Sequence, residues 1–164
     1  MKLTGFTLIE LIIVIGIMSI LTWQGLANYG DFIKKQVVQE EGKDFVSILR
    51  KAQSDANTGY KPSTTCGASD SLVGYRVVGA VLTNTYTVSA VCSNGVETVQ
   101  NNYTLDARVA FSINFDFTFL SPYGNSNGSY TICIAHAQDS SIANAIVSGT
   151  TGGGIELVAA ACPY

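Results

Sequence analysis

Residues 5–27 read GFTLIELIIVIGIMSILTWQGLA, and Glu10 is the only charged side chain among them. The apolar run from Phe6 to Ala27 spans about 33 Å as an α-helix, enough to cross a hydrocarbon core of about 30 Å. Lys2 precedes this run on its N-terminal side. A basic residue there favours retention of the N-terminus in the cytoplasm and export of the rest of the chain. We therefore expect a single membrane-spanning helix over residues 6–27, with the remainder of the chain outside the cytoplasmic membrane.

Glu10 is the unusual residue of this segment. A carboxylate well inside a membrane span costs roughly 2.5–3.5 kcal/mol on insertion scales, and such residues tend to be functional. A position near the interface, with the side chain extended toward water, is the alternative interpretation. Because a buried carboxylate is tolerated when it is paired, the first interpretation requires a cationic partner.

The helix is expected to continue beyond the membrane as an amphipathic helix over residues 28–57. Small and apolar residues recur at spacings of three and four, as on one face of an α-helix; they are Val38, Gly42, Phe45, Leu49, Ala52 and Ala56. Asn57-Thr58-Gly59, followed by Pro62, is typical of a helix end, with Gly59 able to adopt the left-handed cap conformation. The apolar face predicts packing of this half of the helix onto its own domain.

Residues 58–164 change to alternating sequences rich in β-branched and aromatic residues. Strands are expected at 73–78, 85–91, 96–105, 108–112, 115–120, 130–136, 143–148 and 155–160. Turns are expected at Asn94-Gly95, at 122–128 and at the glycines of 152–154. The predicted fold class is α+β, with one long N-terminal helix, half membrane and half amphipathic, packed on an antiparallel β-sheet domain.

All four cysteines lie beyond the membrane segment, and none forms a CxxC or Cys/His cluster with the spacing of metal ligands. An even number of cysteines in an exported domain indicates two disulfides, although four buried free thiols are the alternative. Of the three possible pairings we favour Cys66 with Cys92 and Cys133 with Cys162, because each joins segments that are neighbours in the predicted strand order. No metal or cofactor is expected.

The charge pattern argues against nucleic acid as a partner. The chain of 164 residues has a net charge of −3, and 13% of its residues are charged. Beyond Tyr60 the basic side chains are Lys61, Arg76 and Arg108. These do not form the cluster of cations that displaces counterions from phosphates.

No catalytic centre is predicted. His136, Asp139 and Ser140 lie close in sequence, but no Gly-x-Ser-x-Gly elbow surrounds the serine. Glu40 and Glu41 are adjacent on the predicted helix and face different directions, which is typical of a solvated surface. We expect a protein that is not an enzyme, and a tethered hydrolase using His136 is the rejected alternative.

The segment Gly5-Phe6-Thr7-Leu8-Ile9-Glu10-Leu11 resembles the processing and assembly motif of type IV prepilins and pseudopilins. The resemblance implies that residues 1–5 are a leader, that prepilin peptidase cleaves between Gly5 and Phe6, and that Phe6 is then N-methylated. It also implies that Glu10 pairs with the terminal amine of a neighbouring subunit.

The resemblance extends, more weakly, into the second half of the helix. Residues 49–56 are similar to the helix end of H-type pseudopilins of type II secretion and T-type fimbrial minor pilins, commonly Leu-x-x-Ala-Arg-Ser-Glu-Ala. Gln53 and Asp55 depart from that pattern. Pilins also often carry a proline where this chain has Ala27. Gly16, Gly25 and Gly30 are the residues expected to weaken this helix locally, around Gly25–Gly30 in particular, by roughly 1 kcal/mol each relative to alanine.

The resemblance therefore implies a pilin-like fold and a structural filament subunit, of a type IV pilus or a type II secretion pseudopilus. Its expected partners are other pilin or pseudopilin subunits, prepilin peptidase, the inner-membrane assembly platform and, before assembly, membrane lipid. Its expected final location is an extracellular or periplasmic filament. The alternative is a minor pilin that takes up DNA or adheres through its β domain, but residues 155–164 contain no Lys or Arg.

Overall fold

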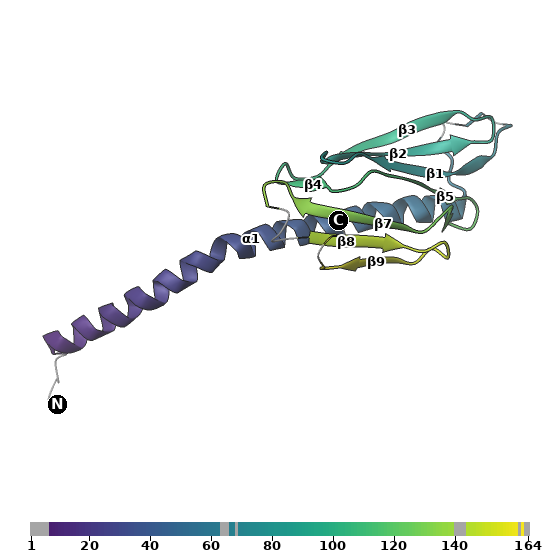
Figure 1. The fold of residues 1–164 in the computed structure, drawn as a ribbon. Helices are drawn as coiled ribbons and strands as arrows, with labels where there is room; N and C mark the ends of the chain where they lie inside the picture. Colours follow the sequence, from purple (N-terminus) through teal and green to yellow (C-terminus); the bar gives the residue numbers. More distant parts are fainter. Residues whose placement is uncertain (1–6, 63–65, 68, 140–143, 161, 163–164) are drawn as a thin grey trace.

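One long helix carries a β domain at its C-terminal half (Figure 1). The computed structural model describes residues 7–62, 66–67, 69–139, 144–160 and 162, without the side chains of residues 23–28 and 144. Helix α1 is Leu8–Thr58. The strands are β1 (Leu72–Gly79), β2 (Thr85–Cys92), β3 (Glu97–Thr104), β4 (Val109–Phe111), β5 (Phe115–Leu120), β6 (Asn125–Ser126), β7 (Tyr130–His136), β8 (Asn144–Gly149) and β9 (Ile155–Val158).

Both ends of α1 have the local chemistry that ends a helix. Thr7 is extended and its hydroxyl accepts the Glu10 N–H at 3.4 Å, which satisfies one of the free donors of the first turn. At the other end Gly59 is left-handed, with φ 64°, and its N–H bonds to Ala56 O. The Tyr60 N–H reaches back to Asp55 O at 3.0 Å and completes the cap. The predicted helix stop at Gly59 is therefore confirmed.

The strands form two antiparallel sheets, with the orders β3-β2-β1-β5-β6 and β4-β7-β8-β9. Strand β1 is central to the first sheet, where Val77 lies opposite Val88 on β2 and opposite Phe117 on β5. In the second sheet, β8 and β9 form the hairpin that was expected across the glycines of 152–154. The α+β fold class is confirmed.

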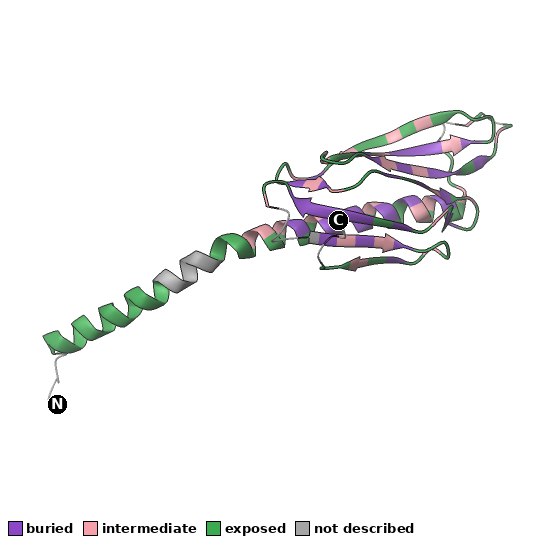
Figure 2. Ribbon diagram, viewed as in Figure 1, coloured by how far each residue is buried: buried purple, intermediate pink, exposed green. Residues whose placement is uncertain are grey.

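The core lies between α1 and the two sheets (Figure 2). Every residue of the predicted helix stripe is buried, from Val38 to Ala56. Phe45 is fully buried, and its ring meets those of Tyr86, Phe111 and Phe115 at centroid distances of 4.9, 5.5 and 5.8 Å. Such edge-to-face contacts add to the free energy gained from apolar burial.

Gly42 explains how closely the helix approaches the second sheet. A Cβ at this position would lie 3.1 Å from Leu157 and 3.2 Å from Ala145. Those two residues belong to β9 and β8, so the glycine lets the backbone of α1 settle against these strands. The helix therefore packs on both sheets rather than on one.

Candidate functional site

The N-terminal part of α1 projects from the β domain with its side chains exposed (Figures 1 and 2). Large apolar side chains cover it on every side of the helix. They are Leu8, Ile9, Leu11, Ile12, Ile13, Val14, Ile15, Ile17, Met18, Ile20 and Leu21. A contiguous apolar surface of this kind marks a site covered by lipid or by another protein.

The polar residues of this segment are arranged so that the helix surface stays apolar. The Ser19 hydroxyl donates to Ile15 O at 2.8 Å, and the Thr22 hydroxyl donates to Met18 O at 2.7 Å. A hydroxyl that bonds to the carbonyl one turn back presents no unsatisfied donor to an apolar environment. The charge of Glu10 is therefore the one strongly polar feature among the described side chains of residues 8–22.

Glu10 lies in the first turn of α1 and is exposed. The positive end of the helix dipole favours a carboxylate at this position. The carboxylate has no ion-pair partner within the described part of the chain. Gly5 and Phe6, the expected cleavage and methylation residues, lie outside the described residues, so their relation to Glu10 stays a prediction.

The described residues contain no helix that meets both the length and the hydropathy needed to cross a membrane. Phe6 and the side chains of residues 23–27, which belong to the expected membrane segment, lie outside the described set.

The structure brings the four cysteines together in two pairs. Cys66, in the loop before β1, is bonded to Cys92 at the end of β2, with their Cα atoms 5.7 Å apart. Cys133 on β7 is bonded to Cys162 near the C-terminus, with Cα atoms 5.9 Å apart. The first bond ties the loop after α1 to the first sheet, and the second ties the chain end to the second sheet.

Of the residues considered for catalysis, the structure describes His136 and Asp139, and the Asp139 N–H donates to the His136 carbonyl oxygen at 3.2 Å. His136 is buried, and its Nδ1 accepts the Gln138 N–H at 3.3 Å. The Asp139 carboxylate forms an ion pair with the Lys34 ammonium at 3.3 Å. Ser140 lies outside the described residues. Among the described side chains, no group of three His, Cys, Asp or Glu residues is placed to hold a metal ion.

The three cations of the β domain are each bonded within the domain. Arg76 binds Glu97 at 2.9 Å and Asp116 at 2.5 Å. Its hydrogen bond holds the pKa of the Asp116 carboxyl below the usual value. Arg108 binds Asp106 at 2.8 Å. The Lys61 ammonium donates to Asp70 O at 2.5 Å.

Gln53 has a structural role that the sequence analysis did not assign. Its side-chain amide donates to Gly124 O at 3.1 Å and to Gly153 O at 2.8 Å. It therefore fixes α1 to one turn of each sheet. The available signal was a long amide beside the apolar stripe, at a position where the resembled pattern has arginine.

Comparisons with known proteins agree with this geometry. Residues 2–23 match the family model of the prokaryotic N-terminal methylation motif. The fold is similar to that of the minor pseudopilin EpsH from the type 2 secretion system of Vibrio cholerae, with 16% sequence identity and a TM-score of 0.53. The similarity covers 74% of this chain and 96% of that chain. A search of curated proteins finds no match.

The motif and the fold together define a class. This chain has a prepilin-type N-terminal motif on a pilin-like α+β fold, and both findings support the type IV pilin and pseudopilin family. They support the role of a structural subunit, which is the role that the sequence resemblance implied.

Proposed function

We propose that this chain is inserted in the cytoplasmic membrane as a prepilin, is cleaved by prepilin peptidase between Gly5 and Phe6, and is then assembled into a filament. Phe6 becomes the N-methylated terminus of the mature subunit. The described apolar surface of α1 becomes the contact between subunits in the filament core. The proposal applies to a pilus and to a pseudopilus, because the motif and fold occur in both.

The observation that carries this proposal is the projecting helix with one exposed carboxylate in its first turn. Burying an apolar helix among copies of itself removes its surface from water or lipid, but it also buries Glu10. Breaking a buried ion pair costs about 3–5 kcal/mol. The ammonium group released by cleavage supplies a partner for the carboxylate.

The same pairing sets the register between subunits. If a neighbour slips along the helix axis, both the carboxylate and the ammonium are left unpaired in an apolar core. The energetic penalty of that slip selects one axial offset, as buried polar groups do in other helical assemblies. Glu10 is in this proposal an assembly residue, not an anchor to lipid.

The experiment compares Glu10→Ala with Glu40→Ala in cells that assemble the filament. Both residues are exposed helical glutamates, but Glu40 lies far from the projecting segment. We expect Glu10→Ala to reach the membrane at the parent level and to be depleted from sheared filaments at least tenfold. Glu40→Ala should enter filaments as the parent does. Equal incorporation of the two variants contradicts the register role of Glu10.

A further inference from the structure

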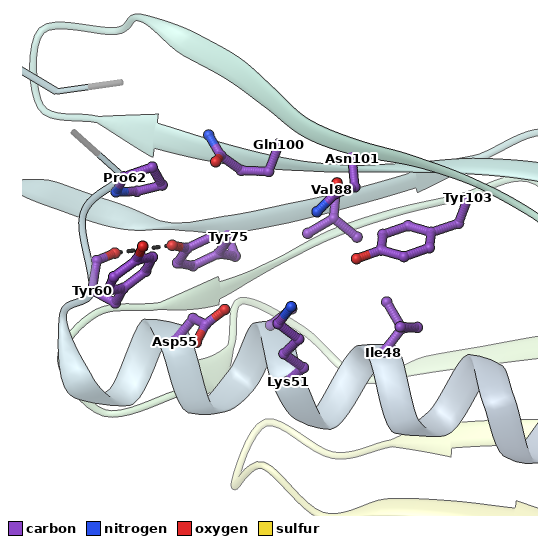
Figure 3. Close-up of a pocket in the computed structure, with 11 residues that line it drawn as sticks. Ile48, Lys51, Asp55, Tyr60, Pro62, Tyr75, Val88, Gln100, Asn101 and Tyr103 are labelled. Carbon is purple, nitrogen blue, oxygen red and sulfur yellow. Dashed lines mark hydrogen bonds between the residues drawn. The ribbon is translucent and has the colours of Figure 1, made fainter. Parts of the chain in front are cut away.

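A groove runs between α1 and the overhanging edge of the first sheet. The helix packs mainly on β1 and β5 of that sheet, so β2 and β3 extend beyond it (Figure 1). Two hollows, of about 370 and 330 Å³, lie beneath this overhang and share Ile48 and Tyr103 in their walls. Figure 3 shows the larger hollow, with Ile48, Lys51 and Asp55 of α1 on one side and Tyr103 of β3 on the other.

The helical wall of this groove is acidic. Its ionisable side chains are Glu41, Asp44, Asp55 and one cation, Lys51. The three carboxylates span fourteen residues, about 21 Å along the helix. The helical wall therefore places three carboxylates and one ammonium group along a cleft whose sheet wall carries tyrosine, asparagine and aliphatic side chains but no cation.

Burial and the carboxylates of the helical wall raise the pKa values of two tyrosines on the sheet wall. Burial raises the pKa of the Tyr86 hydroxyl. The electrostatic effect of Tyr103, and then of Asp44 and Glu41, raises the same pKa further. Burial likewise raises the pKa of Tyr75 to about 12, with Asp55 as the next contribution. The carboxylates therefore act toward the interior of the groove and not only toward bulk solvent.

The opposite flank of the same helix is basic. Lys35, Lys43 and Arg50 are all exposed and are eight and seven residues apart. At 3.6 residues per turn these spacings place them within a sector of about 80°. The flank spans fifteen residues, about 22 Å, which matches the length of the acidic wall.

We propose that the groove binds the basic flank of α1 from a second copy of this chain. The copies meet through different surfaces, so a bound pair still presents one free groove and one free flank. A contact of this heterologous kind continues into an open helical filament instead of closing as a dimer. Assigning the contact to a filament rests on the proposed function, whereas the charge match between groove and flank does not.

The contact aligns subunits rather than supplying most of their affinity. Exposed ion pairs each contribute little and weaken with salt. Their complementarity selects which neighbour docks and at which offset. The long stems of lysine and arginine add apolar contact with Ile48 and Tyr103 when their head groups reach the carboxylates.

The test uses the full chain in phospholipid vesicles, prepared as an equal mixture of ¹⁴N- and ¹⁵N-labelled protein. A water-soluble carbodiimide joins carboxylates to lysine amines that are in contact, and mass spectrometry of tryptic peptides identifies the joined residues. We expect mixed-isotope products that link Glu41, Asp44 or Asp55 to Lys35 or Lys43. Their yield should fall when salt is raised from 50 to 500 mM.

Matched variants distinguish the groove from general attraction between charges. Asp44→Asn and Lys43→Gln should each lower the yield of the remaining groove products about two- to fivefold, the effect of one exposed ion pair. Lys51→Gln should raise it, because it removes the cation of the acidic wall. Glu40→Gln, which alters an exposed carboxylate outside the groove, should leave it unchanged.

Two results overturn the inference. One is the absence of mixed-isotope products at the groove carboxylates, and the other is a yield at Glu40 equal to that at Asp44. If the chain is cleaved after Gly5 but forms no groove product, the groove contact is refuted and the proposed function is not. If the chain forms groove products but keeps residues 1–5, the proposed function is refuted and the groove contact is not.

Discussion

Removing one hydroxyl from the core should make the β domain more stable. Tyr130, on β7, is 8% exposed, and its ring stacks on Phe117 at a centroid distance of 3.9 Å. The ring lies over Gly149, where a Cβ would overlap it. Its hydroxyl is buried without a hydrogen-bond partner in the part of the chain that the structure describes. An unsatisfied buried hydroxyl costs about 1–3 kcal/mol, so Tyr130→Phe should stabilise by about 1 kcal/mol.

Tyr75→Phe is the matched control, with the opposite sign. Tyr75 is also buried, but its hydroxyl donates to Tyr60 O at 2.9 Å (Figure 3). Phenylalanine at this position loses a satisfied hydrogen bond and leaves the carbonyl without its donor, a cost of about 1 kcal/mol. The two variants change the same chemical group, so the difference between them of about 2 kcal/mol isolates the effect of hydrogen bonding.

The pH dependence gives a second measurement. Burial raises the pKa of Tyr130 to about 12, whereas an unfolded tyrosine ionises near 10. Between these values the folded state binds more protons than the unfolded state, so the free energy of unfolding falls as pH rises above about 10. Tyr130→Phe removes this loss, and its advantage over the parent should therefore widen between pH 7 and pH 11.

The assay is urea unfolding of the full chain in a mild detergent, followed by near-ultraviolet circular dichroism at pH 7 and pH 11. We expect the free energy of unfolding of Tyr130→Phe to rise by about 1 kcal/mol at pH 7 and that of Tyr75→Phe to fall by a similar amount. Destabilisation by Tyr130→Phe, with an unchanged urea slope, would refute the assignment of an unsatisfied hydroxyl.

Three further predictions concern the connection of the helix to the sheets. Gln53→Ala should lower the free energy of unfolding by about 1–2 kcal/mol, because two amide hydrogen bonds are lost. Gln39 is exposed, and Gln39→Ala should change that free energy by less than about 0.5 kcal/mol. Phe45→Ala should lower the free energy of unfolding by about 3–5 kcal/mol. A loss below about 1 kcal/mol would contradict the place of Phe45 at the centre of the core. Replacing Cys66 and Cys92 together by serine opens a loop of 26 residues and should cost about 3 kcal/mol. Recovery of a Cys66–Cys133 peptide under non-reducing conditions would contradict the disulfide pairing.

The helix and most strands were predictable because local patterns determine them. The stripe from Val38 to Ala56 and the cap at Gly59 predicted α1, which ends at Thr58. Strands β5 and β7 have the predicted bounds, β1 is one residue longer than predicted at each end, and β2 is one residue longer at its C-terminal end. The alternation of apolar residues in these segments can be recognised from the sequence alone.

The remaining features depend on contacts that the sequence does not display. Strand β6 was missed because Asn125–Ser126 has no apolar alternation and lies in a run expected to be a turn; its pairing with Phe119 and Leu120 creates it. Strand β9 ends at Val158, two residues earlier than expected. The division into two sheets and the overhang of β3 follow from how the sheets pack on α1. The groove and its acidic wall were therefore not visible in the sequence, although its carboxylates were.

The central claim is that cleavage after Gly5 releases the amine that pairs with Glu10 of another subunit. Its most direct test is the intact mass of the chain recovered from filament-assembling cells that have an active prepilin peptidase. We predict a mass that lacks residues 1–5 and carries one added methyl group on Phe6. A chain that retains Met1 to Gly5 in assembled filaments would contradict the account.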